Sequence, residues 1–218
     1  MSPGSTEEAV FSEAPEGVML GGVHVWRIRQ GDPQLLSDSE RAHAEVFRSM
    51  EARAAYVAGR AGVREIGARY TGIPPRGLDV QVGPTGKPFF ANAGVDFNVS
   101  HSGGVVVAAF SVKPVGVDIE RRGRRGDFLA IAQRFFHPDE AAAISGEEDF
   151  LRLWTAKEAM LKLSGDGISG GLEVARPGPG GGGDLAGRSV WLRSFRLGAH
   201  RGAIASFQPF EVKGWFEM

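Results

Sequence analysis

The strongest constraint on the fold is a short alternating segment, VGVDIE, at residues 115–120. Every second residue is valine or isoleucine, and this period of two predicts a β-strand with one buried face. Asp118 and Glu120 then point the same way. Two ionised carboxylates on one strand face repel each other unless a cation lies between them, and a hard ion such as Mg²⁺ is the usual partner. The segment therefore predicts a strand that carries a candidate cation site.

A second segment, WTAKEAMLK at residues 154–162, has apolar positions at helical spacing. Glu158 and Lys162 are four residues apart, so they share one face of the predicted helix. A third carboxylate and a cation could thus meet the strand pair. The alternative is structural: an exposed helix pair worth only about 0.3–0.5 kcal/mol, with Asp118 as a turn former and Trp154 in the core.

Four separated motifs favour the functional interpretation when they are taken together. They are FNVSHSGG at 97–104, GVDIE at 116–120, RFFHPDE at 134–140 and the WTAKEAMLK segment. In this order and spacing the sequence resembles the Sfp-type 4′-phosphopantetheinyl transferases over roughly Arg53 to Gly165. The resemblance implies an α+β fold with two similar halves packed about a pseudo-twofold axis, and coenzyme A in the cleft between them.

The resemblance also implies roles for the acidic and basic residues of the two central segments. Asp118, Glu120 and Glu158 match the acidic triad that holds Mg²⁺ against the coenzyme A pyrophosphate. Lys157 and Lys162 fall on the lysines of the helix motif, and Lys162 is expected near the phosphates.

Further residues match the family's nucleotide contacts. Ser100 and His101 resemble residues that contact the phosphates, and Lys87, in GPTGKPFF, matches a lysine of the nucleotide pocket. Arg53 and Arg60 lie in a predicted helix where the family places basic residues, and both are candidates for coenzyme A binding.

The activity implied is that of a Mg²⁺-dependent holo-[acyl-carrier-protein] synthase. A serine of an apo acyl or peptidyl carrier protein attacks the β-phosphate of coenzyme A, and adenosine 3′,5′-bisphosphate leaves. Glu158 is the candidate base, and Lys162 would stabilise charge on the transferred group. Two alternatives are a non-catalytic carrier-binding module of the same fold and another Mg²⁺-dependent nucleotide transferase. Fatty-acid, polyketide and nonribosomal-peptide synthesis all stay open as pathways.

Net charge, cysteine content and hydropathy limit the partners and the compartment that the protein can have. The net charge of −1 over 218 residues gives no general reason to expect nucleic acid or an anionic membrane as a partner. The absence of cysteine excludes disulfides and thiolate zinc sites and is typical of a reducing compartment. No apolar run is long enough to span a bilayer, and the N-terminus lacks a basic segment followed by a hydrophobic core. We expect a cytoplasmic protein and, from the resemblance, a monomer.

The expected organisation has three parts: a flexible extension at 1–17, an N-terminal α+β half at 18–112 and a C-terminal half at 113–218 that carries the Mg²⁺ motifs. A capping box at Ser37–Glu40 should open a long helical region that reaches Tyr70. The apolar strand at 105–112 should pair antiparallel with 115–120. The glycine-rich 177–184 segment resembles a linker. The arginine-rich loop at 121–125 should be solvated, with docking of an acidic carrier surface as the alternative.

Overall fold

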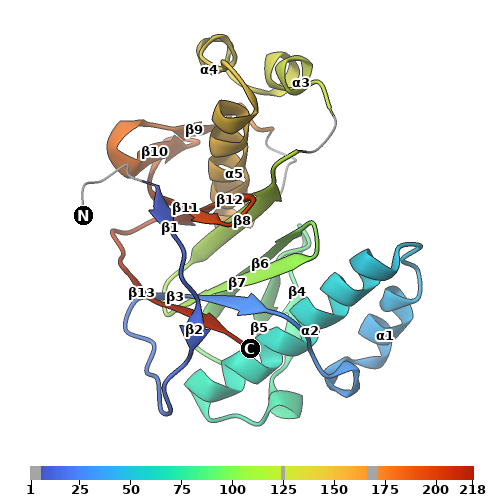
Figure 1. Cartoon of the computed structure of the whole chain (residues 1–218). Helices are drawn as coiled ribbons and strands as arrows, with labels where there is room; N and C mark the ends of the chain where they lie inside the picture. The colour runs from blue at the N-terminus through green and yellow to red at the C-terminus, as the bar shows by residue number, and fades with distance from the viewer. Residues whose placement is uncertain (1–5, 124–125, 166–170) are drawn as a thin grey trace. The chain divides into compact units, whose positions relative to one another are not determined.

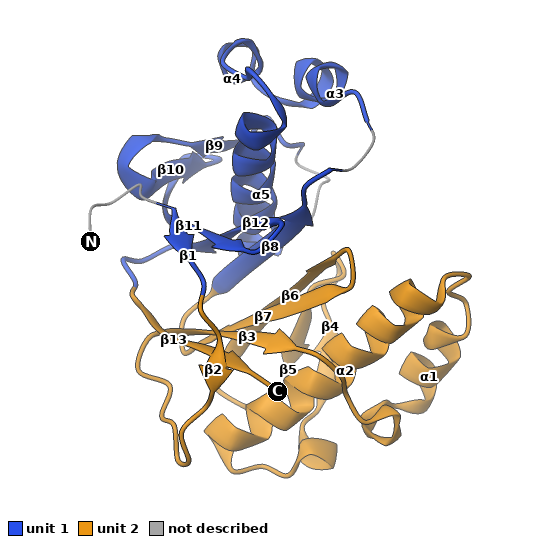
Figure 2. Ribbon diagram, viewed as in Figure 1, with its two compact units in different colours: residues 1–9, 115–210 blue, residues 10–114, 211–218 orange. Residues whose placement is uncertain are grey.

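The computed structural model describes residues 6–123, 126–165 and 171–218. The chain divides into two compact units (Figure 2), and each combines a β-sheet with a long helix, so the α+β class is confirmed. Unit 1 contains residues 1–9 and 115–210, and unit 2 contains residues 10–114 and 211–218. Each unit has a hydrophobic core of its own.

Unit 2 is built on a five-stranded sheet in the order β2-β13-β3-β7-β6 (Figure 1). Aromatic side chains pack on the face of the sheet that the helix covers, where Trp26, Phe97 and Phe110 are fully buried. Two short 3₁₀ helices and the hairpin β4-β5 complete the unit. The elements are β2 (Ser12–Glu13), β3 (Val23–Ile28), a 3₁₀ helix (Pro33–Leu35), α1 (Asp38–Ala44), α2 (Met50–Thr71), a 3₁₀ helix (Pro75–Gly77), β4 (Val80–Val82), β5 (Pro88–Phe90), β6 (Asp96–Ser102), β7 (Val105–Ser111) and β13 (Val212–Glu217).

The helical region of unit 2 begins as the sequence predicts. The Ser37 hydroxyl accepts from the Glu40 amide at 3.2 Å and the Glu40 carboxylate accepts from the Ser37 amide at 2.8 Å, which confirms the capping box. The region is interrupted after α1, and α2 has its own cap from Ser49. α2 contacts β7, β3 and β6, so it covers one face of the sheet.

The expected pairing of 105–112 with 115–120 is wrong. β7 lies between β3 and β6, so both of its edges already carry a hydrogen-bonded neighbour. The following strand, β8 (Val115–Arg121), instead pairs antiparallel with β12 in unit 1. β6 and β7 form the hairpin in its place, and it turns at Gly103 and Gly104, whose positive φ angles of 53° and 76° suit a tight two-residue turn.

Unit 1 is built on the sheet β8-β12-β11-β10-β9, with β1 paired parallel to β11. The long helix α5 contacts β8, β12, β11 and β9, and it lies across one face of this sheet (Figure 1). The elements are β1 (Glu7–Glu8), β8, α3 (Phe128–Phe135), α4 (Pro138–Ala142), α5 (Glu147–Ser164), β9 (Ala175–Pro177), a 3₁₀ turn (Pro179–Gly181), β10 (Gly182–Leu185), β11 (Arg188–Leu197) and β12 (His200–Ser206).

The close contact between β8 and α5 depends on Gly116. A Cβ atom there would collide with the backbone of Ala159 and Leu163, so only glycine lets the helix lie this near the strand. Asp118 and Glu120 follow at intervals of two residues and therefore point from the same face of β8 as Gly116, toward α5. The glycine of GVDIE thus brings the helix to the carboxylates.

The structure differs from the expected organisation in three places. Residues 7–8 and 12–13, expected in a flexible extension, form β1 and β2, and the last strand, β13, belongs to unit 2. The glycine-rich 177–184 segment forms a 3₁₀ turn and part of the β9-β10 hairpin instead of an open linker. Arg124 and Arg125 of the arginine-rich loop lie outside the described residues. Among the described helices, we find none with the length and apolar character needed to cross a bilayer.

Candidate functional site

The central side chains of the candidate site lie in unit 1, on β8 and α5. Asp118 is 3% exposed and Glu158 is 8% exposed. Lys162 Nζ lies 2.6 Å from Asp118 Oδ1, so the cation of the helix motif contacts a carboxylate of the strand motif. The structure therefore brings together the strand motif and the helix motif, whose contacting residues are 44 positions apart in the sequence.

Glu158 has a carboxylate oxygen whose hydrogen-bonding capacity is not satisfied. Its Oε1 is buried and has no hydrogen-bond partner among the described residues. Burial raises the pKa of the Glu158 carboxyl, and the charges of Asp118 and Glu120 raise it further, while Lys162 opposes the effect. All three acids are thus close enough to act on one another electrostatically.

The carboxylate oxygens of Asp118, Glu120 and Glu158 are the type of ligand that a hard cation prefers. Three carboxylates face one lysine across β8 and α5, and the buried Glu158 Oε1 is an oxygen ligand that no described group uses. In the described parts of the chain, however, no three acidic or histidine side chains stand close enough together to hold a metal ion as they are placed. The donor set therefore fits Mg²⁺ in type, and Lys162 contacts Asp118 in this arrangement.

Lys157, the other lysine of the motif, lies in different surroundings. Its side chain is fully buried, and its ammonium pairs with Glu140 Oε2 at 2.7 Å. It also donates to the carbonyls of Leu172 and Ala175 at 3.0 and 2.5 Å. Burial lowers the pKa of Lys157, and the hydrogen bond that its ammonium donates to Glu140 offsets part of this. These contacts join α5 to α4 and to the chain leading into β9.

Glu140 has a second task at the beginning of α4. Its Oε2 accepts from the His137 amide at 3.1 Å and closes a capping box. Through this contact Glu140 stabilises the N-terminus of α4.

In unit 2 a cavity of about 170 Å³ brings two of the expected nucleotide residues together. Arg60 of α2 and His101 of β6 line it, together with the rings of Tyr56 and Phe97. The Arg60 guanidinium lies 5.4 Å from the centre of the Tyr56 ring, its Nε lies 3.9 Å from Glu40 Oε1, and its buried Nη1 has no partner among the described residues. The cavity thus offers a cation and two aromatic faces.

The other expected nucleotide residues are placed differently. Ser100 is buried and, as the strand neighbour of His101, points to the opposite face of β6. Lys87 pairs with Asp96 at 3.2 Å, next to Pro88 in the cavity wall. Arg53 is exposed and forms an ion pair with Glu45.

Two residues of these surroundings were not among the sequence predictions. Tyr56 precedes Arg60 by four residues, and this helical spacing could have indicated the stacked pair. Arg201 of β12 is the register partner of Glu120 and is 6% exposed. Its place could not be read from the sequence because it depends on the pairing of β8 with β12.

Comparison with known proteins follows this division of the chain. A sequence model of the 4′-phosphopantetheinyl transferase superfamily matches residues 114–189, and one described as 4′-phosphopantetheinyl transferase, N-terminal, matches residues 30–113. The chain is 35% identical over 166 residues to 4′-phosphopantetheinyl transferase HetI of Nostoc sp., covering 67% of this chain and 70% of that protein.

Two Bacillus proteins are similar over shorter lengths. The 4′-phosphopantetheinyl transferase psf-1 of Bacillus pumilus is 38% identical over 144 residues, covering 63% of this chain and 61% of that protein. The 4′-phosphopantetheinyl transferase Sfp of Bacillus subtilis is 38% identical over 79 residues, which is 34% of each chain. With both halves matched and HetI covered over more than two thirds of its length, the chain belongs to the 4′-phosphopantetheinyl transferase family.

Proposed function

We propose that the chain transfers the 4′-phosphopantetheine arm of coenzyme A to a serine of an apo acyl or peptidyl carrier protein, with Mg²⁺ held by Asp118, Glu120 and Glu158. Relatives named as 4′-phosphopantetheinyl transferases support the transfer itself. The observation that carries the proposed site is the buried, unpartnered Oε1 of Glu158 on the helix that faces Asp118. A buried carboxylate oxygen without a donor is costly to maintain, which favours a use in binding or catalysis.

Glu158 is well placed for proton transfer because its pKa is raised by burial and by the neighbouring carboxylates. A base whose pKa lies nearer to neutral accepts a proton with less loss of driving force. Glu158 would take the hydroxyl proton of the carrier serine, directly or through water. The serine oxygen then forms its bond to the β-phosphorus as the bridging P–O bond breaks, and adenosine 3′,5′-bisphosphate leaves.

Lys162 and the acidic residues would have different electrostatic roles in the reaction. When bound, Mg²⁺ supplies positive charge to the pyrophosphate, which neutralises part of its charge during transfer. Asp118 and Glu120 would supply oxygen ligands from β8. Lys162, now in contact with Asp118, would turn its ammonium toward the transferred group and stabilise the charge that develops there.

For the nucleotide, the cavity of unit 2 supports two of the proposed contacts. Arg60 and His101 line it, so we assign phosphate contacts to these two residues first. Ser100, Lys87 and Arg53 stay proposed contacts of lower rank. Ser100 is buried and points to the opposite face of β6 from His101, and Lys87 and Arg53 form ion pairs with Asp96 and Glu45. Lys157 would support the site through α5, since its ammonium is enclosed.

A non-catalytic carrier-binding module of the same fold is the weaker alternative. The matched relatives are named as transferases, and the acids and lysine of the motif are all present. A cytoplasmic location, a monomeric state and the choice of carrier pathway stay predictions.

The direct test incubates the purified protein with coenzyme A and an apo carrier protein and follows the carrier by mass spectrometry. We expect the carrier to gain one phosphopantetheine group with Mg²⁺ present, to gain none in excess chelator, and to gain it again when Mg²⁺ is restored. Full transfer after exhaustive chelation would refute the metal assignment. No transfer under any condition would favour the binding module.

A further inference from the structure

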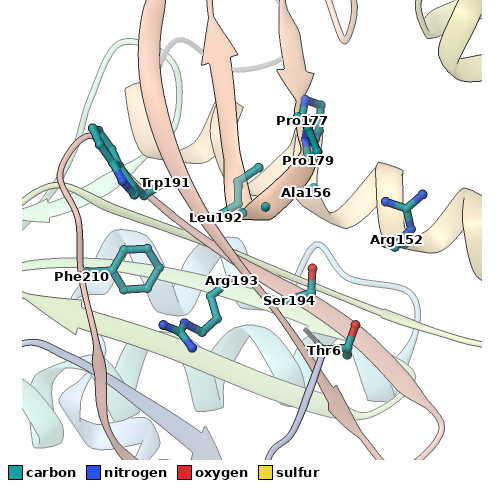
Figure 3. A pocket seen from close by; sticks show the side chains of 13 residues that line it. Thr6, Arg152, Ala156, Pro177, Pro179, Trp191, Leu192, Arg193, Ser194 and Phe210 are labelled. Atoms are coloured by element: carbon teal, nitrogen blue, oxygen red, sulfur yellow. The ribbon is translucent and has the colours of Figure 1, made fainter. Parts of the chain in front are cut away.

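Unit 1 contains a second cavity, of about 290 Å³, that the transfer reaction does not use (Figure 3). Its walls come from α5, from the glycine-rich turn at 178–181 and from β11. This volume is at the lower end of the range of about 300–1,000 Å³ that is typical of small-molecule sites. The space exists because the turn carries four consecutive positions with few side-chain atoms: Gly178, Pro179, Gly180 and Gly181.

The cavity has a one-sided charge. Among the described residues, the ionisable side chains in its wall are Arg152 of α5 and Arg193 of β11, and no acidic side chain lines it. Across the described chain, neither guanidinium has a carboxylate within ion-pair distance. Asp149 interacts with Arg152 at longer range: two hydrogen bonds from Ser145 lower the pKa of the Asp149 carboxyl most, and the charge of Arg152 contributes a smaller lowering. Two arginines without a carboxylate partner favour an anion in the cavity.

The remaining wall is apolar and largely aromatic. Trp191 is 39% exposed, an unusual state for so large a ring, and Phe210 is half-buried. In Figure 3 these two rings lie on one side of the cavity and Arg152 lies on the opposite side, with Arg193 below them. Trp191 is paired in register with Gly182 on β10, so no side chain on that strand covers the ring. An aromatic group could stack there while its charged end reaches an arginine.

The cavity is separate from the Glu158 site although both use α5. Arg152 and Ala156, which line the cavity, are four residues apart and share one face of the helix. Glu158 and Lys162 share another face, turned by about 120° at 100° per residue. A ligand in the cavity would therefore not occupy the position of the transferred group.

We propose that this cavity is a binding site for a small aromatic anion, a single ring that carries a carboxylate or a phosphate. The ring lies against Trp191 and Phe210, and the anionic group accepts hydrogen bonds from Arg193, which leaves the same face of β11 as Trp191, while Arg152 adds positive charge from α5. This site is independent of the proposed transferase chemistry and does not require coenzyme A.

The test uses four probes with the full-length protein: 3-phenylpropionate, phenyl phosphate, 3-phenyl-1-propanol and 3-phenylpropylamine. Binding is followed through the indole N–H signals of the four tryptophans in ¹H–¹⁵N spectra, with the Trp191 signal assigned by Trp191→Phe. We expect saturable shifts at Trp191 with at least one anion, in the millimolar range that suits a ligand of this size. The alcohol should bind at least ~10-fold more weakly than that anion, and the amine should not saturate. The two anions distinguish the carboxylate from the phosphate.

Two variants decide whether the arginines are responsible. Arg193→Gln should weaken binding of the anion by about 5- to 10-fold, and Arg152→Gln should weaken it by less, because Arg152 acts through its charge alone. The double variant that combines both changes should bind the anion no more tightly than Arg193→Gln. Arg134→Gln, on the exposed face of α3 and away from the cavity, should leave binding of the anion unchanged. Thermal unfolding shows that each variant is folded. Absence of saturation at Trp191 for both anions, equal affinity for acid and alcohol, or undiminished binding in the double arginine variant would each overturn the proposal.

Discussion

Replacing Lys157 with methionine tests whether this lysine holds unit 1 together. The ammonium is fully buried, lies 2.7 Å from Glu140 Oε2 and donates to the carbonyls of Leu172 and Ala175. Methionine fills a similar volume, so the change removes mainly the charge and its hydrogen bonds. Glu140 and both carbonyls then lose the donor that now satisfies them.

The expected loss of stability is large. Removing one partner of a buried ion pair costs about 3–5 kcal/mol because the other partner stays in place without its counter-charge. For a domain of this size, each kcal/mol lowers the unfolding midpoint by about 2–4 °C, so we expect a fall of roughly 6–20 °C. Glu140→Gln should cost less, since its amide oxygen can still accept from Lys157 and both carbonyl contacts survive.

Urea unfolding and calorimetry measure both variants, with Lys113→Met as the matched control because Lys113 is exposed. Coenzyme A binding is measured on the same samples. A Lys157→Met protein whose unfolding free energy lies within about 1 kcal/mol of the parent, but whose coenzyme A affinity has collapsed, would refute this reasoning. Such a result would make Lys157 a direct phosphate contact.

Two further predictions concern unit 2. Burial lowers the pKa of His24, whose Nδ1 forms a hydrogen bond of 2.8 Å with the Tyr70 hydroxyl. The unfolded state therefore binds the proton of His24 more readily than the folded state. The stability contributed by His24 should be fully present above about pH 6.5, and the free energy of unfolding should fall below that pH by up to ~1.4 kcal/mol per pH unit. Unfolding curves between pH 8 and pH 5 measure this slope, and a slope unchanged by His24→Phe would contradict the prediction. Arg60→Gln and His101→Ala should each weaken coenzyme A by about 10-fold in calorimetry, and Arg53→Gln by less, because Arg53 is exposed and already paired. Equal effects of all three would argue against the cavity as the nucleotide site.

The sequence predicts the local elements of the candidate site well. The alternation around Asp118 identifies β8, and the four-residue spacing of Glu158 and Lys162 identifies one face of α5. Local patterns suffice here because period and side-chain direction follow from the backbone geometry of each element. The capping box at Ser37 is found for the same reason.

Long-range pairing is what the sequence does not reveal. A short link through Pro114 is typical of a hairpin, yet β7 has both edges filled and β8 pairs with β12, some 85 residues further along the chain. The carbonyls that hold Lys157 come from residues 15 and 18 positions away, in a segment with no signal for this contact. Gly116 is visible in the sequence, but the need for glycine at this position appears only when α5 lies on the strand, because a Cβ atom there would collide with Ala159.

The most direct test of the proposed site is the transfer rate of Glu158→Gln, measured beside its affinity for coenzyme A. Glutamine keeps the size and polarity of the side chain but removes the charge that a metal ligand or a base needs. We expect transfer to fall by at least ~10²-fold, while coenzyme A binding changes by less than about 3-fold and Glu16→Gln, an exposed control, behaves as the parent. A folded Glu158→Gln protein that modifies the carrier at a near-normal rate would contradict the site assignment.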